Sequence, residues 1–124
     1  MTESAADMAF ARDLLSGLGP VETRRMFGGV GLYAGGVMFG LLDEGRIFLK
    51  TDPALEAELR GAGAEPWLYA EHRGPRAGRV VETSYLSLPD SALDDPEEAC
   101  GWARRALAIA EAKKAAGPRR RRRG

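Results

Sequence analysis

The chain has 124 residues, 44% of them apolar, with 18 basic and 18 acidic side chains, a length that fits one domain with its own core. No apolar run approaches the roughly 20 residues that cross a bilayer, and the acidic N-terminal residues do not resemble a secretory signal, so we expect a cytoplasmic protein without a membrane segment. The net charge of zero conceals a separation: residues 1–112 carry all 18 acids and 11 bases, whereas residues 113–124 carry seven bases and no acid.

The first expected element is a helix that ends near Gly17. Thr2 or Ser4 can cap its N-terminus, and Gly19-Pro20 ends it. Its inward stripe at helical spacing consists of Met8, Ala11, Leu15 and Leu18.

From Arg24 the apolar period changes toward two, which predicts strands. We expect one strand over about residues 25–34 and a second over 37–43. They are joined by Gly35-Gly36, a pair that can adopt positive φ at both central positions of a hairpin turn. A third strand at residues 46–50 completes a three-stranded meander.

Two helices and two strands are expected in the second half of the chain. Asp52-Pro53 predicts the start of a short helix that ends at Arg60. Residues 67–69 and 80–86 are strand candidates, separated by an exposed basic loop at residues 73–78. Asp95-Pro96-Glu97-Glu98 predicts the start of a last helix, which runs to about Ala115. Its inward stripe consists of Ala99, Trp102, Ala103, Ala106 and Ala110.

This order predicts a two-layer α+β domain, α-β-β-β-α-β-β-α, with a largely antiparallel five-stranded sheet packed by helices. The domain is expected over residues 1–115, and residues 116–124 are expected to be a disordered arginine-rich tail.

Residues 29–34 match the alanine variant of the dinucleotide fingerprint, Gly-Val-Gly-Leu-Tyr-Ala. That motif needs its glycines between a strand and a helix, so that phosphate meets the helix N-terminus. Here the glycines lie inside a strand pattern, so strand kinks or close packing against a neighbour are favoured.

The candidate nucleophiles and bases do not form a catalytic set. His72 is the one histidine and could act as a general base, but nothing in the sequence brings Ser84, Glu82 or Cys100 to it, so an exposed loop-edge histidine is favoured. Cys100, the one cysteine, lies near the start of the last helix, where its thiol pKa could be lowered. A buried small side chain is the favoured interpretation. We therefore predict no enzyme, no cofactor and no metal site.

Nucleic-acid binding has two candidate sources. Five adjacent arginines can pair with phosphates, although a solvated tail without a dedicated partner is weighed equally; they are Arg119, Arg120, Arg121, Arg122 and Arg123. Trp67, Tyr69 and Tyr85 could stack on bases. Packing on the sheet is favoured for these three rings, because no basic residues interleave with them.

Several blocks, in order, resemble the TfoX/Sxy N-terminal domain family from about Met8 to Ala112. They are Arg25-Met26-Phe27-Gly28-Gly29, Gly31-Leu32-Tyr33, Gly36-Val37-Met38-Phe39, Phe48-Leu49-Lys50-Thr51-Asp52, Gly63-Ala64-Glu65-Pro66-Trp67, Ser84-Tyr85-Leu86-Ser87-Leu88-Pro89 and Trp102-Ala103. The resemblance implies the same α-β-β-β-α-β-β-α domain. In full-length members a helical C-terminal domain follows, and the whole regulates natural competence genes together with a transcription activator. Here the arginine segment stands in its place, so we expect a stand-alone N-terminal domain.

The function expected from these observations is a non-enzymatic regulatory or protein-interaction module, with a protein partner that could belong to the transcription machinery. The alternative is a nucleic-acid-binding protein that uses its arginine-rich tail for weak, non-specific phosphate contacts. A homodimer is left open.

Overall fold

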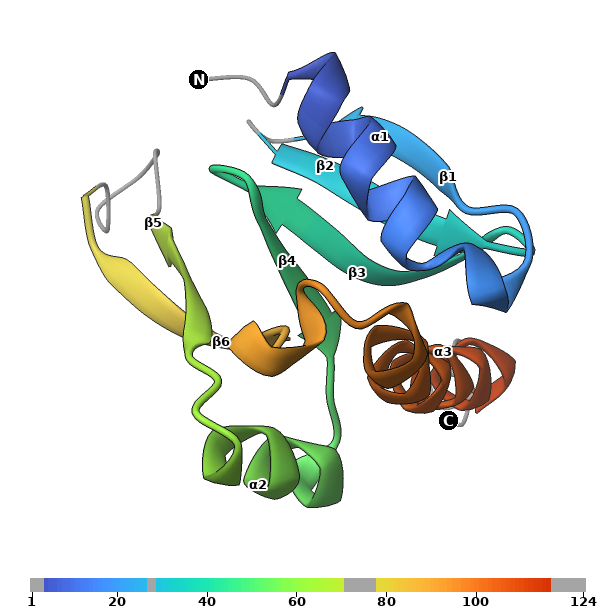
Figure 1. Ribbon diagram of the computed structural model, residues 1–124. Coiled ribbons are helices and arrows are strands. Elements are labelled where there is room, and N and C mark those ends of the chain that lie inside the picture. Colours follow the sequence, from blue (N-terminus) through green and yellow to red (C-terminus); the bar gives the residue numbers. More distant parts are fainter. Residues whose placement is uncertain (1–3, 27–28, 71–77, 117–124) are drawn as a thin grey trace.

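The computed structural model describes residues 4–26, 29–70 and 78–116. Over these ranges the chain forms three α-helices and one six-stranded sheet with the strand order β1-β2-β3-β4-β6-β5 (Figure 1). All neighbouring strands pair antiparallel. The α+β class and the antiparallel sheet are therefore confirmed. The elements are α1 (Ala5–Leu14), β1 (Glu22–Met26), β2 (Gly29–Ala34), β3 (Val37–Asp43), β4 (Arg46–Lys50), α2 (Pro53–Gly61), β5 (Pro66–Ala70), β6 (Val80–Ser87) and α3 (Pro96–Ala116), with short 3₁₀ turns at Ser16–Leu18 and Asp90–Ala92.

The prediction of one strand over about residues 25–34 is wrong, and with it the count of five strands. This stretch contains the end of β1 and all of β2, which pair antiparallel with Met26 opposite Gly29. Phe27 and Gly28, between them, lie outside the described residues. Apolar residues and glycines continue without interruption across this reversal, so the sequence pattern did not mark it. In addition, β1 is largely polar and exposed, so it carries little of the apolar alternation that predicts a strand.

The predicted helix starts are confirmed by their caps. The Ser4 hydroxyl accepts a hydrogen bond from the Asp7 amide at 3.0 Å, and the Asp52 carboxylate accepts one from the Leu55 amide at 2.8 Å. The Asp95 carboxylate accepts hydrogen bonds from the amides of residues 97 and 98, both at 3.1 Å. These side chains satisfy amide groups that have no partner within the helix.

The core lies between the helices and one face of the sheet. Strand alternation directs Val30 and Leu32 of β2 into it, where they pack with Leu15, which follows α1. The stripe of alanines predicted on α3 is buried, which brings this helix close to β3 and β4 (Figure 1). Trp102, predicted in the same stripe, is only half-buried.

The glycines of the β2–β3 region are needed for close packing. A Cβ added at Gly40 would lie 2.5 Å from the carbonyl oxygen of Phe48, and one at Gly29 would lie 2.8 Å from that of Leu42. The interpretation of close packing against a neighbour is therefore confirmed for Gly29, the first glycine of the motif. The predicted hairpin turn is confirmed too, since Gly35 and Gly36 have φ of +59° and +81°.

Candidate functional site

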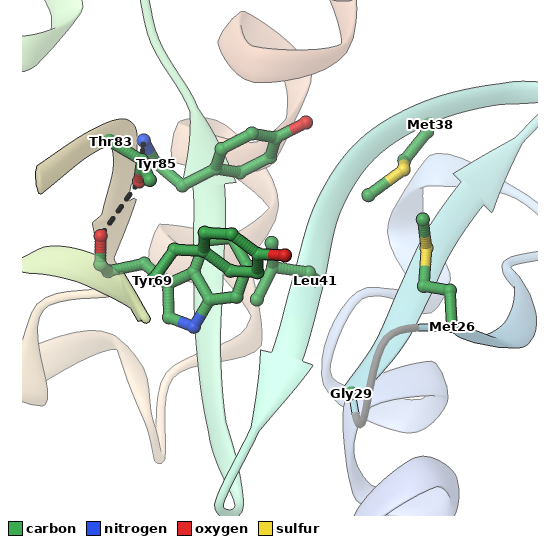
Figure 2. A pocket seen from close by; sticks show the side chains of 8 residues that line it. Met26, Gly29, Met38, Leu41, Tyr69, Thr83 and Tyr85 are labelled. Carbon is green, nitrogen blue, oxygen red and sulfur yellow. Dashed lines mark hydrogen bonds between the residues drawn. The ribbon is translucent and has the colours of Figure 1, made fainter. Parts of the chain in front are cut away.

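The face of the sheet opposite the helices carries an apolar groove of about 400 Å³ (Figure 2). We call it the open-face groove, and it is lined by Met26, Gly29, Met38, Leu41, Trp67, Tyr69, Thr83 and Tyr85. Its volume lies in the range of roughly 300–1,000 Å³ typical of ligand sites. Figure 2 shows Met26 and Met38 on one side, Tyr69 and Tyr85 on the other, and Leu41 between them. Nothing in the described part of the chain fills this space.

The methionine side of the open-face groove depends on a glycine, Gly31, which has no side chain to fill the space. Gly31 pairs with Leu41 and, by alternation, faces away from the core that Val30 and Leu32 enter. A Cβ at Gly31 would lie 2.9 Å from the sulfur of Met26 and 3.4 Å from that of Met38. The glycine therefore leaves the room that these two flexible, polarizable side chains occupy.

The aromatic side is built by β5 and β6. The Trp67 ring lies 5.7 Å from the Tyr69 ring and 6.3 Å from the Tyr85 ring, with interplanar angles of 51° and 81°. The Trp67 indole N–H donates to the Asp43 carboxylate at 3.0 Å, and the Thr83 hydroxyl donates to the Trp67 carbonyl at 2.8 Å. These contacts fix the indole against the sheet and fill the hydrogen-bonding capacity of its N–H group.

A second hollow of about 330 Å³ adjoins the open-face groove and shares Met38 and Tyr85 with it. Its lining includes three lysines, Lys50 at the end of β4 and Lys113 and Lys114 in the last turn of α3, together with uncharged residues of β3, β6 and α3. We call these three residues the lysine rim. Across the described ranges, no carboxylate forms an ion pair with any of them.

Burial and one neighbouring charge act on Lys50 of the lysine rim. The Lys50 ammonium lies 5.2 Å from the centre of the Tyr85 ring, within cation–π range. Partial burial, and then the charge of Lys113, lower the pKa of Lys50. Burial, and then Tyr33, raise the pKa of the Tyr85 hydroxyl, so this ring stays neutral at physiological pH.

The sequence argument, that no basic residue interleaves with Trp67, Tyr69 and Tyr85, does not hold in space for Tyr85, because Lys50 lies against its ring. Besides Lys50 on Tyr85, the Arg24 guanidinium lies 4.7 Å from the centre of the Tyr33 ring. These partners come from neighbouring strands, which a linear reading does not bring together. The preference for packing over stacking nevertheless agrees with the geometry, because the three rings of the groove stand tilted or edge-on to one another.

The remaining sequence candidates have varied outcomes. Cys100 is 4% exposed, and its sulfur lies 3.5 Å from the Leu14 carbonyl oxygen, so the prediction of a buried small side chain is confirmed. His72 and the five arginines at 119–123 lie outside the described residues. Over the described ranges, His, Cys, Asp and Glu side chains form no group able to hold a metal ion, and no helix has the length and apolar character that a membrane crossing requires.

Sequence reasoning missed the open-face groove and the lysine rim. Met26 lies on the non-core side of β1, which strand alternation could have shown if β1 and β2 had been separated correctly. Met38 and Leu41 share the open face although they are three positions apart, because the register of β3 shifts between them, and alternation does not show this. The meeting of Lys50 with Lys113 and Lys114 depends on where α3 ends relative to the sheet, which no local pattern shows.

Comparison with known proteins agrees with this architecture. The family model of the TfoX N-terminal domain matches residues 13–110, which includes β1 to β6 and most of α3. No curated protein matches the chain. The matched residues include all eight that line the open-face groove. The chain belongs to the TfoX N-terminal domain family.

Proposed function

We propose that the chain is a non-enzymatic regulatory module that binds a protein partner by receiving an apolar side chain of that partner in the open-face groove. The observation that carries the proposal is an apolar, aromatic and methionine-lined groove on the sheet face that the helices leave uncovered. Aromatic residues and methionine are enriched in protein interfaces, and contiguous apolar surface on a small domain marks interaction sites.

The polar atoms in the groove support binding rather than chemistry. The Thr83 hydroxyl donates to the Trp67 carbonyl and accepts the Tyr85 amide, and the Trp67 indole N–H is used by Asp43. A nucleophile needs an adjacent base and an orienting group. The described lining residues include no histidine, cysteine, lysine or carboxylate.

The process in which we place this binding is regulation of transcription, with the partner a component of the transcription machinery. Its support is family membership together with the role that the resemblance implies for full-length members. A cytoplasmic location agrees with such a role and stays a prediction.

Matched variants in an affinity-capture experiment test the proposed function. Met38→Lys places a charge in the groove. Leu68→Lys introduces the same charge on β5 at a residue that is 56% exposed. Leu68 pairs with Glu82, which binds Arg60 of α2, so it lies on the helix side of the sheet. Thermal unfolding first shows that both variants fold.

We expect one identifiable protein to be retained by the unmodified chain and by Leu68→Lys and to be lost with Met38→Lys. Calorimetry with that purified partner should then give the same order of affinities. Retention that does not distinguish Met38→Lys from the unmodified chain would contradict binding at the groove.

A second candidate function is nucleic-acid binding through Arg119–Arg123. It is favoured by the charge separation of the sequence, since Lys113 and Lys114 are exposed and precede the arginine segment. Each phosphate neutralised releases counterions, so the affinity for duplex DNA should fall steeply with salt. A chain without residues 117–124 should lose that affinity. Equal salt-dependent affinity in both forms, or none in either, would rule it out.

A further inference from the structure

The open-face groove and the lysine-lined hollow form one continuous surface. Met38 and Tyr85 line both, so a ligand in the groove that extends past these two side chains enters the hollow. The two parts differ in charge, because the residues that line the groove carry none, whereas three of those that line the hollow are lysines. A ligand that fits both is apolar at one end and anionic at the other.

Charge complementarity sets the sign of the second contact. Lys50, Lys113 and Lys114 lie close enough that Lys113 disfavours the charged form of Lys50, and Lys50 is partly buried beside Tyr85. In the described part of the chain, no acid forms an ion pair with any of these lysines. A carboxylate placed among the three would interact favourably with all of them and would relieve their mutual repulsion.

The observations favour a peptide segment over nucleic acid. Successive bases need ring faces that are accessible along a strand, whereas Trp67, Tyr69 and Tyr85 meet at 51° and 81° and close the groove from one side. A pocket of this shape fits one or two apolar side chains, with the charged hollow beside it.

Two occupants from the chain itself are disfavoured. The arginine segment at residues 119–123 has the same sign of charge as the lysine rim. A second copy would have to offer an acidic run, and in the densest run, at residues 94–98, two of the four carboxylates are already engaged. Asp95 caps α3, and the Glu98 carboxylate accepts hydrogen bonds from Ser91 and Trp102.

We infer that the partner contributes an acidic peptide segment, in which an apolar or aromatic side chain enters the open-face groove and a neighbouring Asp or Glu contacts the lysine rim. This inference rests on the proposed function and names the chemistry of its partner. The groove supplies most of the affinity through burial of apolar surface, and the lysine rim selects among apolar segments by charge.

Selection from a displayed library of random short peptides on the full-length chain tests the inference. We expect the selected peptides to carry Asp or Glu within a few residues of a large apolar side chain. The best peptide is then synthesised, and its dissociation constant is measured by fluorescence anisotropy with three variants. Met38→Ala tests the groove, and Lys113→Glu tests the lysine rim. Arg12→Glu is the matched control, an exposed charge reversal on α1, across the sheet from the groove.

Lys113→Glu should weaken binding by about fivefold to tenfold, the size expected for one exposed charge reversal, and the effect should shrink at high salt. Met38→Ala should weaken it by about tenfold or more, as for a central interface residue. Arg12→Glu should change the affinity by less than about twofold.

The outcomes separate the two proposals. The inference would be overturned if the selected peptides carry no acids and bind Lys113→Glu as tightly as the unmodified chain. The proposed function would still stand if Met38→Ala weakens their binding. Peptides unaffected by both variants would overturn both. Displacement of the peptide by single-stranded oligothymidylate would assign this surface to nucleic acid instead. A dimer in sedimentation that Met38→Ala dissociates would assign it to a second copy of the chain.

Discussion

Trp67 on β5 donates a hydrogen bond of 3.0 Å to the carboxylate of Asp43 at the end of β3, although β4 and β6 lie between these two strands in the sheet. The contact spans the curved open face and holds the aromatic side of the groove in place. Asp43→Ala would leave the half-buried indole N–H without this partner. We expect a loss of about 1–2 kcal/mol in the free energy of unfolding.

Urea unfolding measures this loss, and the fluorescence of Trp67 reports its environment once Trp102 has been changed to Phe. Asp13→Ala, which removes an exposed carboxylate from α1, is the control and should cost no stability. Equal stability of Asp43→Ala and the unmodified chain would show that the bond contributes nothing.

Gly40 tests the close packing of β3 against β4. A Cβ there would lie 2.5 Å from a backbone oxygen, which cannot move aside as a flexible side chain can. Gly40→Ala should therefore lower the free energy of unfolding by about 1–3 kcal/mol, the usual cost of overpacking. Gly61→Ala is the matched control, because nothing lies within 4 Å of its added Cβ at the end of α2. It should be neutral or slightly stabilising, and a reversed order of the two variants would contradict the packing described here.

The ion pair between Glu58 of α2 and Arg105 of α3 predicts a pH dependence. Two hydrogen bonds of 2.7 Å join the groups. Hydrogen bonding to Arg105 lowers the pKa of Glu58 below its usual 4.5, burial opposes this, and the charge of Arg105 adds to the lowering. A lowered carboxyl pKa stabilises the fold at pH values above 4.5 and loses this effect as the pH falls through the folded pKa.

Glu58→Gln should therefore be less stable than the unmodified chain at neutral pH and equally stable at acidic pH, below the folded pKa of Glu58. Thermal unfolding measured between neutral and acidic pH checks this. Because both side chains are largely exposed, high salt should also reduce the difference. A difference that persists unchanged at low pH would assign the effect of the substitution to something other than the charge of Glu58.

The pKa of Lys50 reports how strongly the charges of the lysine rim interact. Burial first, and the charge of Lys113 second, lower this pKa. Lys113→Gln should raise the pKa of Lys50 without restoring the usual 10.5, since the burial remains. Titration of the lysine side-chain resonances by NMR measures it. If the pKa of Lys50 is the same in Lys113→Gln as in the unmodified chain, the two groups do not interact.

The helix starts could be predicted from the sequence because their signals are local. Ser4, Asp52 and Asp95 each precede a helix and bond to amides two or three residues later. The Gly35-Gly36 turn was equally local. The reversal between Met26 and Gly29 was not predicted, because apolar residues and glycines run on through it, and Gly29 and Gly31 are used for close contacts with Leu42 and Met38 on the next strand.

The candidate site could be predicted only in part. Trp67, Tyr69 and Tyr85 were singled out as aromatic side chains on strands, and they do lie together. Their basic neighbour Lys50 was missed, because antiparallel pairing of β4 with β6 places it opposite Tyr85, 35 positions away in the chain. Register and the end of α3 are tertiary properties, so the lysine rim becomes visible only in the structure.

The NMR shifts of the methionine methyl groups give the most direct test of the central claim, which is binding at the open-face groove. Met26 and Met38 line the groove, whereas Met8 of α1 packs against the core on the other side of the sheet. We predict that titration of the selected acidic peptide into chain labelled with ¹³C at the methionine methyls shifts the Met26 and Met38 resonances and leaves Met8 unchanged. A bound peptide that shifts Met8 alone, or that leaves Met26 and Met38 in place, would contradict the account.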